Sequence, residues 1–294
     1  MRQRAYGYAA VTLFCLGIAP VAQAELKPIS EETMGEVTGQ AFMQIENIPG
    51  DTHAFTRMTL TMDVETRMNV DDVQAGDIDG GVDFAAQHVA LGHIARNDGE
   101  QFNGRTYSAG DTVHFEAFKP YIELAEDAGG LLAGFRMGFG QARGSVSSLT
   151  SSFSGDIGLK LVSGGQEYDA TLFDENAQAT NYRASHIGIN DPAAAPADCT
   201  AGSETNCAPL THLQSITVGE EGVDGVTDFT SDFFIGFQRE GVNWQSPDGA
   251  TVINAGKGVF INLPTSMKVD MSQLITQGVD RLQTHREDMG RKLF

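Results

Sequence analysis

Along residues 58–70, apolar and polar side chains alternate with a period of two. The apolar residues occupy even positions: Met58, Leu60, Met62, Val64, Met68 and Val70. The polar residues occupy odd positions: Thr59, Thr61, Asp63, Glu65, Arg67 and Asn69. Because successive side chains of a strand point to opposite faces, this pattern predicts one long strand with one solvated face.

Shorter runs of the same kind follow along the chain, separated by turn sequences such as Asn97-Asp98-Gly99 and Pro247-Asp248-Gly249. The predicted strands are Phe84–Ile94, Thr112–Phe118, Tyr121–Ala125, Leu131–Gly138, Ile157–Val162, Tyr168–Phe173, Leu213–Val218, Asp232–Phe237 and Val252–Ile261. The Ser/Thr-rich run 145–154 is interpreted as a polar strand face. Many short strands with glycine-bearing turns predict a mainly β fold, an antiparallel β-sandwich or a wrapped β architecture, in one domain over residues 25–294.

Helical signals are confined to the two ends of this domain. Ser30 can cap a short helix that ends at Gly39, and a strand-like run over 41–48 follows it. Near the C-terminus, Asp270 and Gln273 form a capping box before apolar residues with helical spacing, which predicts a helix near 271–289. We interpret this helix as one that docks on the β domain, with a partner-binding helix as the alternative.

The first 24 residues have the pattern of a secretory signal peptide. Arg2 and Arg4 precede an apolar stretch over 8–18, and Ala22-Gln23-Ala24 is a small-x-small cleavage site. After residue 24, no apolar run approaches the ~20 residues that a membrane helix needs. The sequence therefore predicts export to the periplasm, the outer-membrane surface or the extracellular space, without a transmembrane segment in the mature chain.

Two cysteines, Cys199 and Cys207, remain after removal of this segment. An even pair in an exported chain predicts a disulfide. The bridge would close part of a long Pro/Ala/Gly/Ser-rich loop near 190–209.

The charge balance excludes two classes of partner. The chain has 39 acidic residues against 19 Lys and Arg, a formal charge of −20. Nucleic acid and anionic lipid both attract basic surfaces. We therefore expect no nucleic-acid partner and no electrostatic docking on anionic membranes.

Motifs for catalysis are absent from the sequence. No G-x-S-x-G nucleophile elbow, phosphate-binding loop or dinucleotide fingerprint occurs, and none of the seven histidines has a zinc-ligand partner at the usual spacing. We interpret the histidines as ordinary surface or core residues. The prediction is a non-enzymatic protein, although chance pairs of carboxylates leave a secreted hydrolase as a third alternative.

One acidic cluster suggests a cation. Asp77, Asp79 and Asp83 alternate with glycines and can offer the hard oxygen ligands that Ca²⁺ prefers. The spacing is not that of an EF-hand, because His88 stands where the bidentate Glu belongs. A solvated acidic turn is the alternative, and calcium is the only cofactor that the sequence suggests.

Several segments resemble a group of uncharacterised exported Gram-negative proteins, some of which are labelled pilus-assembly proteins of the Fil type. The resemblance rests on Leu26-Lys27-Pro28-Ile29-Ser30 and Met34-Gly35-Glu36-Val37-Thr38-Gly39-Gln40-Ala41, with weaker likeness at Pro120–Leu124, Gly134–Phe139, Ala142–Gly144 and Gly258–Thr265. It implies export and membership of a surface assembly, and it brings no catalytic residues.

Taken together, these features predict a component of a cell-surface or filament-like, pilus-type assembly that contacts other exported or surface proteins, or further copies of itself. The expected assembly segment contains Val37, Gly39, Gln40, Phe42, Met43 and Ile45, because a terminal strand is easily added to an open sheet edge. The alternative is that this segment completes its own sheet. The runner-up function is a periplasmic or outer-membrane-associated binding protein for an apolar small molecule.

Overall fold

The computed structural model describes residues 42–76 and 80–285. The chain divides into two units, 1–40 and 41–294, and every described residue belongs to the second unit. Several predictions fall outside the described residues: the signal peptide, the helix near Ser30, Val37, Gly39, Gln40, Asp77, Asp79 and the end of the predicted C-terminal helix. The described residues form a mainly β structure, as the alternating pattern predicts.

The principal sheet contains a row of seven neighbouring strands. In spatial order these are β1 (Met43–Pro49), β2 (Ala54–Leu60), β10 (Phe115–Glu126), β11 (Leu132–Ser152), β20 (Phe234–Gln238), β23 (Gly258–Leu263) and β12 (Gly155–Ile157). All these pairs are antiparallel except β12 with β23. Beyond β2, the short strand β3 (Asp63–Thr66) also pairs with β10.

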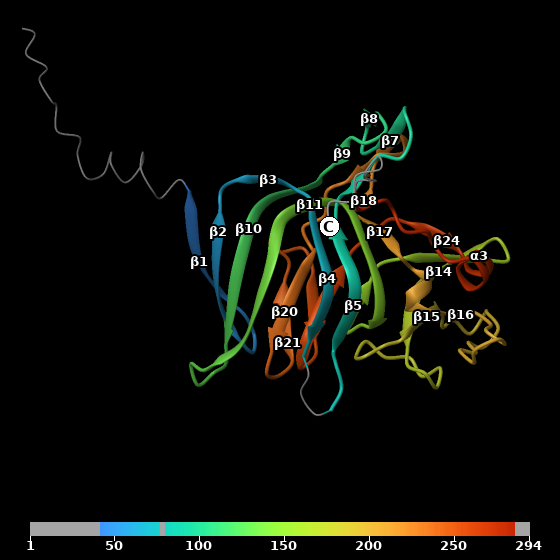
Figure 1. Cartoon of the computed structure of the whole chain (residues 1–294). Helices are drawn as coiled ribbons and strands as arrows, with labels where there is room; N and C mark the ends of the chain where they lie inside the picture. The colour runs from blue at the N-terminus through green and yellow to red at the C-terminus, as the bar shows by residue number, and fades with distance from the viewer. Residues whose placement is uncertain (1–41, 77–79, 286–294) are drawn as a thin grey trace, which may run out of the picture. The chain divides into compact units, whose positions relative to one another are not determined.

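Strand β11 bends and takes part in two sheet regions (Figure 1). Its first half pairs with β10 and β20, whereas its second half pairs with β5 (Phe84–Leu91) and β17 (Ser215–Val218). Strand β4 (Met68–Ala75) pairs with the outer edge of β5. The change of partner occurs at Gly144, whose φ of 143° is a conformation that favours glycine. A Cβ there would lie 2.8 Å from the ring of Phe115.

A second sheet of five strands contains the disulfide region. Its order is β16 (Cys207–Pro209), β15 (His186–Ile189), β14 (Gln166–Phe173), β13 (Lys160–Ser163) and β24 (Lys268–Asp270). Two-stranded ribbons are β6 (His93–Ile94) with β9 (Thr112–Val113), β7 (Glu100–Phe102) with β8 (Arg105–Tyr107), β18 (Glu220–Glu221) with β19 (Thr227–Asp228), and β21 (Val242–Gln245) with β22 (Val252–Ala255). The helices within the described ranges are α3 (Met271–Thr276) and the 3₁₀ turns η1 (Leu210–His212) and η2 (Val223–Gly225).

The buried apolar residues form two main clusters. The larger one joins the second half of β11 to the five-stranded sheet and α3, and includes Phe153, Leu161 and Leu274. The smaller one lies under the β21–β22 ribbon, where Trp244 packs on Phe55 with ring centroids 5.6 Å apart. The ribbon therefore covers one face of the principal sheet.

The prediction of a single strand over 58–70 is wrong. The chain forms β2, β3 and the start of β4 instead. The first break lies opposite Lys119 of β10, which has a φ of 51° and whose backbone N–H donates to Met62 O at 2.9 Å. The second break comes where the chain leaves β10 and pairs with β5. Alternation within each piece is kept, so the pattern marked the faces correctly but not the strand ends.

The C-terminal helix is much shorter than predicted. Asp270 caps it as expected, accepting from the backbone N–H of Gln273 at 3.0 Å. The helix ends at Thr276 because Gly278 adopts φ of 76° and donates back to Gln273 O, which is the geometry of a helix C-terminus. The described residues that follow are not helical, and Leu282 donates its N–H to Ser215 Oγ at 3.0 Å.

The Ser/Thr-rich run lies on a strand, as predicted, and part of its polar face is buried. It forms the second half of β11, where Ser145 and Ser147 are buried. Ser147 is hydrogen-bonded to Ser215 of β17 at 2.9 Å. Their hydroxyls satisfy one another inside the fold, which is how a polar residue is accommodated in a core.

Candidate functional site

One face of the principal sheet is a continuous apolar surface, here called the apolar floor. Strand register places side chains from six neighbouring strands in a row across it: Ile45, Met58, Ile122, Met137, Ile235 and Ile261. Beside this row, the rings of Phe139 and Phe233 are stacked with centroids 6.0 Å apart. On its other side, the Phe135 and Phe237 rings are stacked at 5.0 Å.

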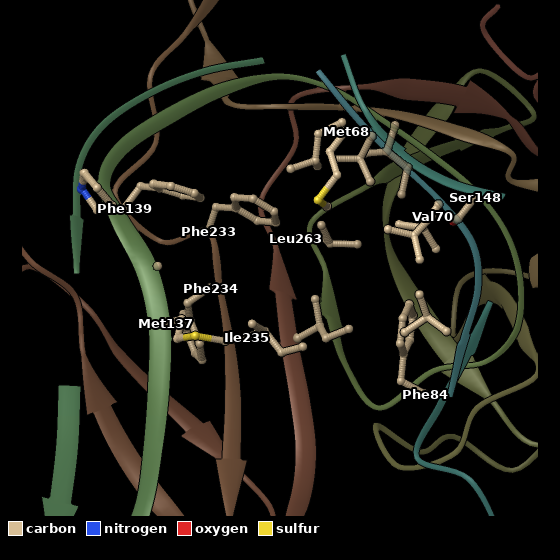
Figure 2. Close-up of a pocket in the computed structure, with 18 of the residues that line it drawn as sticks. Met68, Val70, Phe84, Met137, Phe139, Ser148, Phe233, Phe234, Ile235 and Leu263 are labelled. Carbon is tan, nitrogen blue, oxygen red and sulfur yellow. The ribbon is translucent and has the colours of Figure 1, made fainter. Parts of the chain in front are cut away.

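A second wall faces this floor across the bend in β11. It is made by β4, β5 and the second half of β11, with Met68, Val70, Val89, Leu91, Val146, Ser148 and Thr150. Figure 2 shows Met68 and Val70 on one side of the space and Phe139, Phe233 and Met137 on the other. Because β11 bends at Gly144, the apolar floor and the wall face each other.

Between the floor and the wall lies a cavity of about 700 Å³. Among the described residues that line it, none has a charged side chain, and the lining residues of a type that carries a hydroxyl are Ser148, Thr150 and Tyr121. Four lining residues remain between 41% and 44% exposed: Met43, Met68, Ile122 and Met137. The cavity is therefore open to solvent along an apolar rim, and its size is in the range of small-molecule sites.

The opposite face of the same sheet buries charge. Glu123 binds Arg57, and its other oxygen accepts from Arg136 Nη2 at 3.1 Å. All three residues are at most 5% exposed. The Arg136 guanidinium also lies 4.9 Å from the ring centre of Phe234 and 5.0 Å from that of Trp244. We call Arg57, Glu123 and Arg136 the buried ion triad.

The sheet is thus covered on its charged face and open on its apolar face. Neighbouring residues on β10 show this directly, because Glu123 is buried whereas Ile122 is 43% exposed. Removing apolar surface from water is worth about 25 cal/mol per Å². An uncovered apolar face is consequently a typical mark of a binding surface.

A serine, a histidine and a glutamate form a hydrogen-bonded chain next to the bend. His93 Nδ1 lies 2.8 Å from Ser145 Oγ, and His93 Nε2 lies 3.2 Å from Glu100 Oε1. The order resembles that of a hydrolase triad. However, Ser145 and His93 are each 1% exposed, and neither lines the cavity. In this geometry, the chain of bonds holds β6 and β7 against β11, and His93 is the satisfied core histidine that the sequence suggests.

A second hollow, of about 710 Å³, is lined by more polar groups. It contains Asp156, Asp232, Asn262 and Thr251. Burial raises the pKa of both Asp156 and Asp232. Asp232 accepts a hydrogen bond from Thr251 at 3.0 Å, and its backbone oxygen accepts from Asn262 at 2.7 Å. These contacts tie the start of β20 to β22 and β23.

The structure joins Cys199 to Cys207 in a disulfide, as predicted. The bridge packs against Phe173 of β14. It therefore anchors the long loop to the five-stranded sheet, away from the cavity lining.

Of the predicted calcium ligands, only Asp83 is described. Its carboxylate accepts from Arg183 Nε at 2.8 Å and from the backbone N–H of Val259 at 2.9 Å. The side chain is thus used as an internal anchor between β5 and β23. Within the described residues, no group of three or more His, Cys, Asp or Glu side chains is arranged to hold a metal ion.

Of the predicted assembly residues, Phe42, Met43 and Ile45 are described. Met43 and Ile45 lie on the apolar floor at its edge, and Phe42 directly precedes β1. Strand β1 pairs with β2 of its own sheet through seven residue pairs, so this strand completes its own sheet. Among the described strands it has no partner on its other side.

Sequence reasoning did not locate the cavity. Its clearest signal was present in the alternation over 58–70, because Met58, Leu60, Met68 and Val70 all line the cavity. The pattern was interpreted as one buried face. It did not show that the apolar sides of β2 and β4 would face each other across an open space, since that depends on the bend in a distant strand.

No helix within the described ranges has the length and apolar character needed to cross a membrane. Comparison with protein-family models, with curated proteins and with solved structures gives no match for this chain. The cavity and its geometry are therefore the basis for a functional assignment.

Proposed function

We propose that this protein is an exported, non-catalytic binding protein for an apolar small molecule, which it holds in the cavity between the apolar floor and the wall formed by β4 and β5. The supporting observation is the cavity of about 700 Å³, in which none of the described lining residues is charged. The disulfide is compatible with an oxidising compartment outside the cytoplasm.

Four methionines on the cavity walls support this function further. Met43, Met58, Met68 and Met137 all line the cavity. Methionine side chains are unbranched and adaptable, and they are common on surfaces that accept ligands of varied shape. A long, flexible hydrocarbon fits such a lining better than a rigid polar metabolite.

The test uses the mature protein and N-phenyl-1-naphthylamine, a probe whose fluorescence rises in apolar sites. We expect saturable binding to the wild type. Met137→Glu places a charge on the floor and should weaken binding at least about tenfold, because an unpaired charge in an apolar site is costly. The matched control is Met62→Glu, since Met62 is 38% exposed but does not line the cavity. Absence of saturable binding, or equal loss in both variants, would contradict the proposal.

A role in a surface assembly is the second candidate, and the exposed edge of β1 favours it. Phe42 and Ile45 are 56% and 58% exposed, and Glu46 is the only charged residue of the strand. An edge without several charges can pair with a strand of another chain. This function and ligand binding are compatible, because the apolar floor extends to the same edge.

Light scattering tests this second role. If β1 joins copies of the protein, the wild type should form dimers or larger species, and Ile45→Lys should reduce them to monomers without unfolding. Val223→Lys is the control, because Val223 is 81% exposed and lies in η2, outside β1. A monomeric wild type at high protein concentration would argue against self-assembly through this edge.

A further inference from the structure

We infer that the natural ligand is an uncharged acyl ester, such as a glyceride or another neutral ester lipid, and not a free fatty acid or other anion. This inference rests on the proposed function and deepens it. It uses two features of the cavity: the described lining residues include no cation, and a pair of hydroxyls lies on the wall.

The first feature concerns charge. Proteins bind anionic lipid heads through Lys and Arg clusters. The described residues that line this cavity include neither Lys nor Arg. The chain as a whole carries a formal charge of −20, which disfavours approach of an anion. A carboxylate or phosphate inside the cavity would lose its hydration without gaining a cationic partner.

The second feature is the hydroxyl pair of Ser148 and Thr150, which both line the cavity on the second half of β11. The two oxygens lie 2.8 Å apart and are hydrogen-bonded to each other. One such bond uses one hydroxyl proton and leaves the other hydroxyl proton free to donate. Within the described residues, neither side chain has a further hydrogen-bond partner.

An ester carbonyl is the group that fits this pair. It accepts a hydrogen bond, carries no charge and interrupts an otherwise apolar chain at one point. A ligand of this class would satisfy the free hydroxyl proton while its hydrocarbon covers the apolar floor. A pure hydrocarbon would leave the hydroxyl proton without an acceptor, and a buried unsatisfied donor is unfavourable. The observations therefore favour a neutral ester over both alternatives.

The experiment measures displacement of the naphthylamine probe from the mature protein at pH 8. The competitors are monododecanoylglycerol and dodecanoate, which share a chain length but differ in charge, each used below its micelle concentration. We expect the ester to displace the probe at a concentration at least about tenfold lower than the carboxylate.

The double variant Ser148→Ala/Thr150→Val tests the role of the hydroxyls. Relative to the probe affinity of the same variant, it should require a higher concentration of monododecanoylglycerol for displacement, because the ester carbonyl then has no hydroxyl donor. Ser151→Ala is the control, because Ser151 is exposed, bonds to Ala85 O and does not line the cavity. Circular dichroism would confirm that all variants are folded.

The outcomes separate the two proposals. If no saturable probe binding occurs in the wild type, the proposed function is wrong and this inference is lost with it. If the probe binds but dodecanoate competes as well as the ester, the inference about charge is wrong and the binding function stands. Displacement by monododecanoylglycerol that is unchanged in the double variant would contradict the role of the hydroxyl pair.

Discussion

At the scale of single residues, the carboxylate of Glu123 compensates the charges of two buried arginines. The residue is 1% exposed, and its carboxylate forms ion pairs with both Arg57 and Arg136. Removing one partner of a buried ion pair leaves the others uncompensated and costs about 3–5 kcal/mol. We therefore expect Glu123→Gln to lower the free energy of unfolding by about this amount in urea titrations. Glu126→Gln, at the exposed end of the same strand, should have little effect, and a similar loss in both variants would contradict this role for the triad.

His93 should make stability depend on pH. Burial lowers the pKa of His93 from its usual value of 6.5, although the hydrogen bond with Glu100 acts in the opposite direction. The unfolded chain then binds the proton more readily than the folded one. The stabilising contribution is complete above pH 6.5 and decreases as the pH falls through the lowered pKa.

Unfolding curves at several pH values between about 5 and 7 measure this effect. We expect the wild type to lose stability toward the acid end more steeply than His93→Gln, in which the group that titrates is absent. Parallel pH profiles for the two proteins would show that His93 does not contribute. His285→Gln is a control at an exposed position.

At the scale of elements, the bend in β11 determines the geometry of the cavity. Gly144 has φ of 143°, and a Cβ at this position would lie 2.8–2.9 Å from atoms of Phe115. We expect Gly144→Ala to destabilise the protein by about 1–3 kcal/mol through backbone strain. It should also weaken probe binding, because the bend sets the position of the wall relative to the floor.

Thermal unfolding with and without the probe measures both effects of this change. Gly256→Ala is the matched control, because nothing lies within 4 Å of a Cβ at that position. If Gly144→Ala were as stable as Gly256→Ala and bound the probe equally well, the bend would not depend on the glycine.

At the scale of the whole molecule, the cavity should be sensitive to methionine oxidation. Peroxide transfers an oxygen atom to a thioether and is itself reduced to water, which converts methionine to the polar sulfoxide. Met43, Met68 and Met137 line the cavity and are more than 40% exposed. We expect mild peroxide treatment to weaken probe binding roughly tenfold, because polar groups then replace apolar lining.

Peptide mass spectrometry would identify the oxidised residues. A triple variant with Leu at positions 43, 68 and 137 should keep its affinity after the same treatment. Met62→Leu, the control, should remain as sensitive as the wild type, because Met62 is exposed outside the cavity lining. If the triple variant lost as much probe affinity after peroxide treatment as the wild type, oxidation of residues outside these three positions would be responsible.

The amino-acid sequence by itself determined the local features of this protein. The period of two identified strands and their faces, because alternation is a property of each extended segment. Asp270 identified the start of a helix, since a cap acts within one turn. The pairing of Cys199 with Cys207 followed from there being two cysteines after the N-terminal segment. Each of these depends on residues that are close in the sequence or few in number.

Only the tertiary structure decided which face of each strand is covered and what lies opposite it. Alternation distinguishes two faces of β10 but does not say that Glu123 is buried and Ile122 exposed. That outcome depends on the β21–β22 ribbon, more than 100 residues later, covering one face. The cavity likewise requires β2 and β4 to lie on opposite sides of the bend at Gly144. The physical reason is that burial is set by contacts between segments that are distant in the sequence, whereas periodicity reflects only the geometry of a single segment.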